Sequence, residues 1–155
     1  MIKFYKLIIV IAIISLPACG FKVSNNILFS EFYIESIETS NKKIDFLIKQ
    51  SLKNKLSNEN AIKQIRLNVN NSKTRTINEK DVQNKITKYE ILIETNLEVT
   101  FLNNLEKQSI KVSSSGIYNV SSKHIETKRN QENLEKYLVN KNVEQILKSL
   151  TNIKK

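Results

Sequence analysis

ITKYEILIETNLEVTFL, residues 86–102, alternates apolar and polar side chains over most of its length. One set of alternate positions holds Tyr89, Ile91, Ile93, Leu97, Val99 and Phe101, and the other holds Glu90, Glu94, Asn96, Glu98 and Thr100. Successive side chains of a strand point to opposite faces. The pattern therefore predicts one long strand with one buried face and one solvent-facing face.

Two more strands are expected on either side of this segment. After it, the Asn-Asn pair at 103–104 is typical of a turn, and residues 107–121 alternate again. Gly116 inside that run predicts a bulge or a bend. Before it, residues 61–69 alternate, and the strand is expected to continue through 72–77, where hydroxyl and cationic side chains alternate. The short connections predict an antiparallel meander.

The remaining apolar segments predict one strand and two helices. Residues 29–37 are aromatic and β-branched, which favours a strand. Residues 42–57 and 125–150 carry apolar side chains at helical spacing. The expected order is β-α-β-β-β-α, with a right-handed parallel crossover after the first strand. We predict an α+β two-layer sandwich, with two helices packed on one face of a four-stranded mixed sheet.

The first residues have the features of a bacterial export signal. Lys3 and Lys6 precede an apolar run of about ten residues, which fits a signal-peptide core and is too short to span a bilayer. Leu16, Ala18 and Cys19 resemble the lipobox of bacterial lipoproteins, whose cysteine becomes the mature N-terminus and carries acyl chains such as palmitate. An uncleaved anchor and a plain secretory signal are the alternatives.

These features divide the chain into three expected parts. Residues 1–18 are predicted to be a lipoprotein signal peptide, residues 19–28 a lipidated tether, and residues 29–155 the sandwich domain. Cys19 is the only cysteine, so the domain is expected to be held by packing and sheet hydrogen bonds alone. The formal net charge of +10 indicates an anionic neighbour, either nucleic acid, phospholipid or phosphorylated glycolipid. Export excludes nucleic acid.

Three stretches together resemble the LptE family of lipopolysaccharide-assembly lipoproteins. They are the lipobox ending Ala-Cys-Gly-Phe-Lys at 18–22, the strand ending Tyr-Ile-Glu-Ser-Ile at 33–37 and the helix from Ile44 to Leu56. The resemblance implies an outer-membrane lipoprotein at the periplasmic face that forms a complex with the LptD β-barrel. It also implies binding of lipopolysaccharide and help with its insertion into the outer leaflet. Gly20 stands where an acidic residue would resemble an inner-membrane retention signal, which favours the outer membrane.

Candidate lipopolysaccharide-binding residues are cations near strand ends. Lys73 and Arg75, two apart on a predicted strand, would point the same way and could hold a phosphate of lipid A. Lys123, near the far end of the meander, is the third candidate. The alternative for each is a solvated charge that keeps a strand edge from pairing with other chains.

The sequence argues against catalysis. His124 is the only histidine, and two glycines cannot build a phosphate-binding loop. Glu90, Glu94 and Glu98 are spaced ~13 Å apart on a strand, which is too far for shared chemistry. We expect no enzymatic activity, no cofactor and no metal. Two other roles stay open: an auxiliary lipoprotein of an ABC-type lipid transport or cell-envelope complex, and a carrier that encloses a lipid in an apolar cavity.

Overall fold

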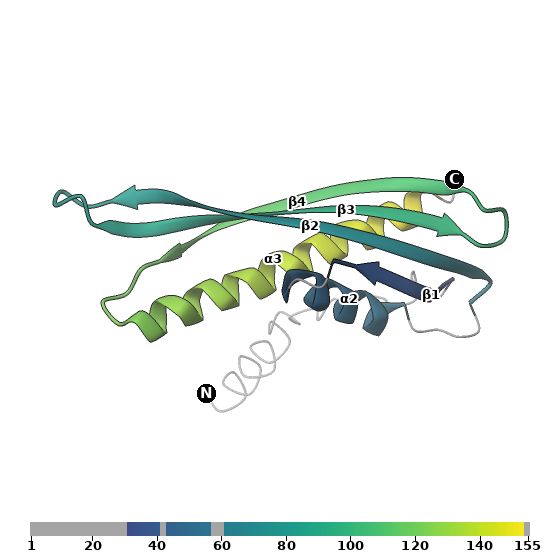
Figure 1. The fold of residues 1–155 in the computed structure, drawn as a ribbon, viewed down its shortest axis with the longest axis horizontal. Helices are drawn as coiled ribbons and strands as arrows, with labels where there is room; N and C mark the ends of the chain where they lie inside the picture. Colours follow the sequence, from purple (N-terminus) through teal and green to yellow (C-terminus); the bar gives the residue numbers. More distant parts are fainter. Residues whose placement is uncertain (1–30, 41–42, 57–60, 154–155) are drawn as a thin grey trace, which may run out of the picture.

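The structure, a computed structural model, describes residues 31–40, 43–56 and 61–153 and has the predicted order β-α-β-β-β-α (Figure 1). Its elements are β1 (Phe32–Thr39), α2 (Lys43–Lys55), β2 (Lys63–Lys80), β3 (Ile86–Phe101), β4 (Lys107–Asn119) and α3 (His124–Asn152). The first strand therefore ends two residues later than predicted, and the expected start at residue 29 lies outside the described residues. The helix expected at residues 125–150 is one continuous helix of 29 residues.

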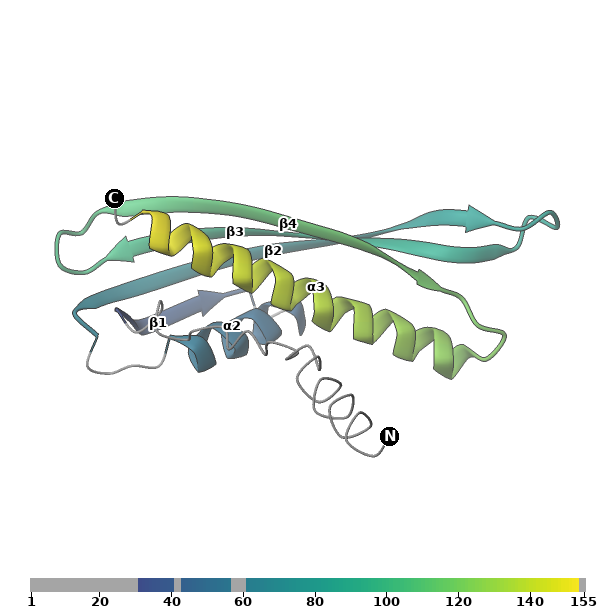
Figure 2. The same cartoon turned by 180° about the vertical axis from the view of Figure 1, so that it is seen from behind.

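The four strands form one mixed sheet in the order β1-β2-β3-β4. β1 is parallel to β2, and the two following pairs are antiparallel, as the short connections predicted. Both helices lie on the same face of the sheet, with α3 running beneath β3 and β4 and α2 beside β1 (Figures 1 and 2). The predicted α+β two-layer sandwich is confirmed.

The core lies between these two layers. Of the apolar positions predicted in β3, the central four are buried and Tyr89 and Phe101 at the ends are partly buried. Leu138, Val143 and Ile146 of α3 belong to the same core. Thr95 is a polar residue on this buried face, and the Asn142 amide of α3 donates hydrogen bonds to its hydroxyl and to the carbonyl of Ile93, both at 3.1 Å. These two hydrogen bonds from a buried amide nitrogen fix one position of the helix along the strand, although the Oδ1 atom of Asn142 is buried without a partner among the described residues.

An irregularity in β1 changes which of its side chains are buried. The pairing with β2 shifts register between Ile34 and Ser36, so Glu35 is an extra residue in the strand. Ile34 and Ile37 are three residues apart, yet both are buried. The bulge explains how an apolar spacing that does not alternate strictly still supplies one core face.

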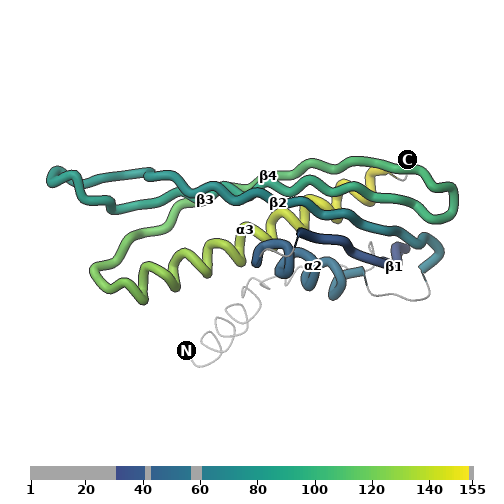
Figure 3. Tube along the Cα trace, viewed as in Figure 1, coloured from purple at the N-terminus to yellow at the C-terminus, as the bar shows by residue number. Residues whose placement is uncertain are grey.

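The hairpin formed by β2 and β3 extends well beyond β1. β1 pairs only with residues 63–69, whereas β2 continues to Lys80. We call residues 70–96 the hairpin arm. At its tip, the Asp81 carboxylate accepts hydrogen bonds from the backbone N–H groups of Gln83 and Lys85, at 2.9 and 2.8 Å. The trace in Figure 3 shows that the arm and the first half of α3 diverge from one another.

Gly116 does not form the predicted bulge, because β3 and β4 pair without a register shift from Lys88 to Thr100. The glycine instead lets α3 approach the sheet. A Cβ atom at this position would lie 2.8 Å from Cδ1 of Leu134, which is shorter than a van der Waals contact. A glycine is required at position 116, but the reason is close packing between the helix and the sheet.

Replacing Gly116 with Val should therefore destabilise the fold by about 1–3 kcal/mol, the usual cost of overpacking. Urea denaturation followed by circular dichroism would measure it. Ser115→Val is the matched control, since Ser115 is exposed on the opposite face and should change little. In a Leu134→Ala background the cost of Gly116→Val should shrink. An equal cost in both backgrounds would contradict the proposed contact.

Candidate functional site

The predicted lipid-attachment residue, Cys19, lies outside the described residues. The other candidate residues lie around an open cleft of about 620 Å³ between the hairpin arm and the first half of α3. We call it the arm–helix cleft. Its cationic lining residues are Lys43, Lys73, Arg75 and Lys128, and its carboxylates are Glu132 and Glu135. Five elements, α2, β2, β3, β4 and α3, and the loop before α3 contribute to it, so only the folded chain assembles this surface.

Lys73 is held by an ion pair within the cleft. Its ammonium lies 2.9 Å from Oε1 of Glu135, whose side chain is only 2% exposed. Burial opposes ionisation of Glu135, but hydrogen bonds from Gln131 and Lys73 and the charges of Lys73 and Lys43 outweigh it, so the pKa of Glu135 lies below its ordinary value. The Lys73 ammonium therefore neutralises a buried carboxylate and is not free to bind a ligand.

Arg75 has a different environment. Its guanidinium carbon lies 4.6 Å from the ring centroid of Tyr89, which stacks on Tyr118 with centroids 5.7 Å apart. This cation–π contact orients the guanidinium plane without using its N–H groups. Among the described residues no carboxylate forms an ion pair with Arg75. Its donors are therefore available to an anion.

Lys123 lies at the rim and does not line the cleft, although its neighbours Ser122 and His124 do. Its ammonium is 3.6 Å from Glu126 and its side chain is 73% exposed, so the pair is weak. The structure thus brings Lys73 and Arg75 together, as their spacing predicted, and places the third candidate beside them.

Lys43 and Lys128 are cleft residues that the sequence reasoning missed. Lys128 lies three and seven residues before Gln131 and Glu135, which also line the cleft, so helical spacing could have revealed it. Lys43 comes from α2, and its ammonium pairs with Glu132 at 3.2 Å. Nothing in the local sequence indicates that α2 begins beside α3.

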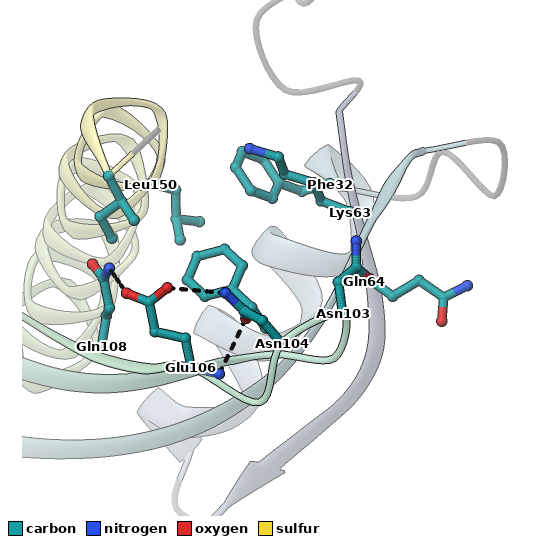
Figure 4. Close-up of a pocket in the computed structure, with 10 residues that line it drawn as sticks. Phe32, Lys63, Gln64, Asn103, Asn104, Glu106, Gln108 and Leu150 are labelled. Atoms are coloured by element: carbon teal, nitrogen blue, oxygen red, sulfur yellow. Dashed lines mark hydrogen bonds between the residues drawn. The ribbon is translucent and has the colours of Figure 1, made fainter. Parts of the chain in front are cut away.

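A second, smaller pocket of about 270 Å³ lies at the opposite end of the sheet (Figure 4). Phe32, Phe101 and Leu150 form an apolar wall, and the Lys63 ammonium lies 5.8 Å from the Phe32 ring centroid. Glu106 is committed to its neighbours, because it accepts hydrogen bonds from the side chains of Asn104 and Gln108. The pocket is amphipathic and no cluster of titratable groups lines it.

The glutamates of β3 point to the solvent-facing side of the sheet. Glu98 pairs with Lys107 across the strands at 3.0 Å, and Glu94 accepts a hydrogen bond from the Ser72 hydroxyl. In the described part of the chain, no group of three or more His, Cys, Asp or Glu side chains is placed to hold a metal ion. Nor does any helix in that part have the length and apolar character needed to cross a membrane.

The fold places the chain in a class of small two-layer domains in which a parallel β-α-β unit is followed by a meander and a long helix. No protein-family model and no curated protein sequence matches it. Among solved structures it is similar to rare lipoprotein B from Shewanella oneidensis, with a TM-score of 0.59 and 21% identity over 79% of this chain and 96% of that one.

Two further structures are similar. Lipoprotein B from Nitrosomonas europaea has a TM-score of 0.62 and 17% identity, over 87% of this chain and 92% of that one. A minor lipoprotein from Acinetobacter baumannii has a TM-score of 0.53 and 12% identity, over 81% and 95%. At this level of identity the likeness establishes a fold that the chain shares with bacterial lipoproteins.

Loss of Lys73 should destabilise the protein. Lys73→Met leaves the buried Glu135 carboxylate without its cation, at a cost of about 1–3 kcal/mol near neutral pH. The pKa of Glu135 is lowered in the folded protein. The ion pair therefore stabilises the folded state at pH values above the ordinary glutamate pKa, and this contribution is lost as the pH falls through the pKa of the folded state. The difference between the variant and the parent protein should therefore shrink in acid.

Urea denaturation over a range of pH would measure this, with Lys43→Met as the matched control. Lys43 forms an exposed pair with Glu132, so its loss should cost less than about 1 kcal/mol. Equal costs for the two variants, or a cost for Lys73→Met that does not depend on pH, would contradict the assigned role of Lys73.

Proposed function

We propose that this chain is a lipid-anchored outer-membrane protein that assists the assembly of lipopolysaccharide together with an LptD-like β-barrel, and that it holds the anionic part of lipopolysaccharide in the arm–helix cleft. The observation that carries the proposal is an arginine oriented on a tyrosine and free of carboxylate partners within a basic cleft. The lipobox at Cys19 and the fold shared with bacterial lipoproteins support the envelope location.

The residues of the cleft divide into two roles. Arg75 can offer two parallel N–H groups to a phosphate, and Lys128 adds a second cation that no described carboxylate pairs with. Lys73 and Lys43 instead balance Glu135 and Glu132. Lys123 contributes at the rim. A phosphorylated glycolipid fits this arrangement better than a neutral ligand does.

The proposed task is binding and positioning, and it involves no covalent step and no cofactor. The hairpin arm suits a partner with a water-filled interior, because every β2 side chain from Ser72 to Lys80 is exposed and mostly polar. Large β-barrels enclose such an interior. A rigid polar arm could occupy that space without burying unpaired groups.

The anchor is tested by Cys19→Ala. Two or three acyl chains hold a protein stably at a membrane, whereas a domain without them should be found in the soluble periplasmic fraction. Fractionation of cells that lack the barrel partner shows where the variant is found, and mass spectrometry of the mature N-terminus shows whether the parent protein carries acyl chains. A parent protein that is membrane-bound without acyl mass would contradict the lipid anchor.

The cleft is tested by the double variant Arg75→Ala and Lys128→Ala. In low salt its dissociation constant for purified lipopolysaccharide should rise about tenfold or more, which corresponds to about 1.4 kcal/mol per decade. The matched control is Lys141→Ala with Lys148→Ala, which removes two exposed charges of α3 that do not line the cleft. An equal loss in the control would mean that net charge alone attracts the lipid.

A further inference from the structure

The hairpin arm has an edge that no described strand covers. β1 pairs with residues 63–69 of β2 and then ends, whereas β2 continues to Lys80 with β3 on its other side only. An uncovered edge presents a row of backbone N–H and C=O groups that can pair with another strand. Whether this one is usable depends on which groups point outward, what space lies beside them and which side chains flank them.

Two backbone hydrogen bonds fix the direction of the backbone groups. The Gln64 carbonyl accepts a hydrogen bond from the N–H of Leu102 at 3.0 Å, so Gln64 faces β3, whereas the Lys63 N–H donates to the Glu31 carbonyl at 3.1 Å on the β1 side. The backbone groups of successive residues in a strand point to opposite sides. No register shift interrupts β2 and β3 before Ile77. The outward groups are therefore those of Asn71, Lys73, Arg75 and Ile77.

Open space lies beside the start of this edge. A cavity of about 310 Å³ is lined by Lys43 and Ile44 of α2 and by Asn71, Ser72 and Lys73 of β2. It lies where β1 ends, so a strand entering it would continue the line of β1. Towards the tip, every β2 side chain from Ser72 onward is exposed, and no described strand pairs with the outward edge there.

The flanking charges discriminate between occupants. Lys73 and Arg75 share the helix-facing side of the arm, and the opposite side carries the hydroxyls of Ser72, Thr74 and Thr76. A second copy that covered the edge from 71 to 77 in antiparallel fashion would place Lys73 opposite Arg75 twice, and like charges in directly opposed positions are destabilising. A strand with an acidic residue beside Arg75 would meet an opposite charge instead.

We propose that the edge of β2 from Asn71 to Ile77 accepts an extended acidic segment of a partner protein as a fifth strand. The backbone supplies the affinity, and Arg75 selects a carboxylate beside it, while Lys73 stays paired with Glu135. The proposal differs from the binding of lipopolysaccharide because its affinity comes from the backbone edge, although both use the guanidinium of Arg75.

The test uses the purified full-length chain in detergent and an acetylated peptide, Thr-Val-Thr-Glu-Val-Glu-Thr-Val-Thr. Amide hydrogen exchange should slow at residues 71, 73, 75 and 77 when the peptide is added, and the even-numbered amides, which already bond to β3, should not change. The same peptide with lysine in place of glutamate should bind at least tenfold more weakly.

Proline at position 75 separates backbone pairing from charge. Arg75→Pro removes an outward N–H, which an edge strand tolerates, whereas Arg75→Ala removes the same charge and keeps the donor. The acidic peptide should bind Arg75→Pro about tenfold more weakly than Arg75→Ala. Should the proline variant fail to fold, Arg75→Glu provides a second test, since it should shift the preference toward the lysine peptide.

Three results would overturn the proposal. The first is equal binding of the acidic peptide to the proline and alanine variants. The second is protection that appears at other amides. The third is slow exchange of the odd-numbered amides without any peptide, together with a dimer in analytical ultracentrifugation, which would identify a second copy as the occupant.

Discussion

Covering one face of the meander is the constraint on which the rest of this structure depends. β3 pairs with strands on both sides, so its apolar side chains can be buried only from above or below the sheet. The second half of α3, from Leu138 to Leu150, does this, and Gly116 and Asn142 set how closely and at which position it lies. The remaining features are arranged around this contact.

The lengths of the two layers explain where the cleft forms. A helix of 29 residues is about 44 Å long, whereas a strand of 18 residues spans about 60 Å. The sheet is therefore longer than the helix that covers it, and the part that extends past the core has to be polar. The change from buried Val69 to exposed Ser72 marks that point on β2, and the cationic cleft begins immediately beyond it.

The fold could be predicted from the sequence because its main signals are local. Alternation in β3 and helical spacing in α3 each depend on neighbouring residues, and both were confirmed. The bulge at Glu35 and the role of Gly116 could not be predicted, because they depend on a partner strand and on Leu134 of a distant helix. The spacing of Lys73 and Arg75 correctly predicted that both side chains lie on the same side of the strand. It did not predict that Lys73 pairs with the buried carboxylate of Glu135.

The ion pairs inside the cleft also depend on residues that are distant in the sequence. Ion pairs such as Lys73 with Glu135 join residues 62 positions apart, and only the packing of α3 on the sheet brings them together. The sequence alone does not show which lysines are paired with carboxylates and which are free to bind a ligand. The structure separates cations that are needed for stability from those that remain for ligands.

The place of α3 after all four strands has a consequence for folding. A chain synthesised from its N-terminus completes the four strands before the helix that covers them. During that interval the apolar side of the meander faces water and the strand edges are open, which favours aggregation with other chains. A holding chaperone that recognises extended apolar segments would act in this interval, and would release the chain when α3 docks.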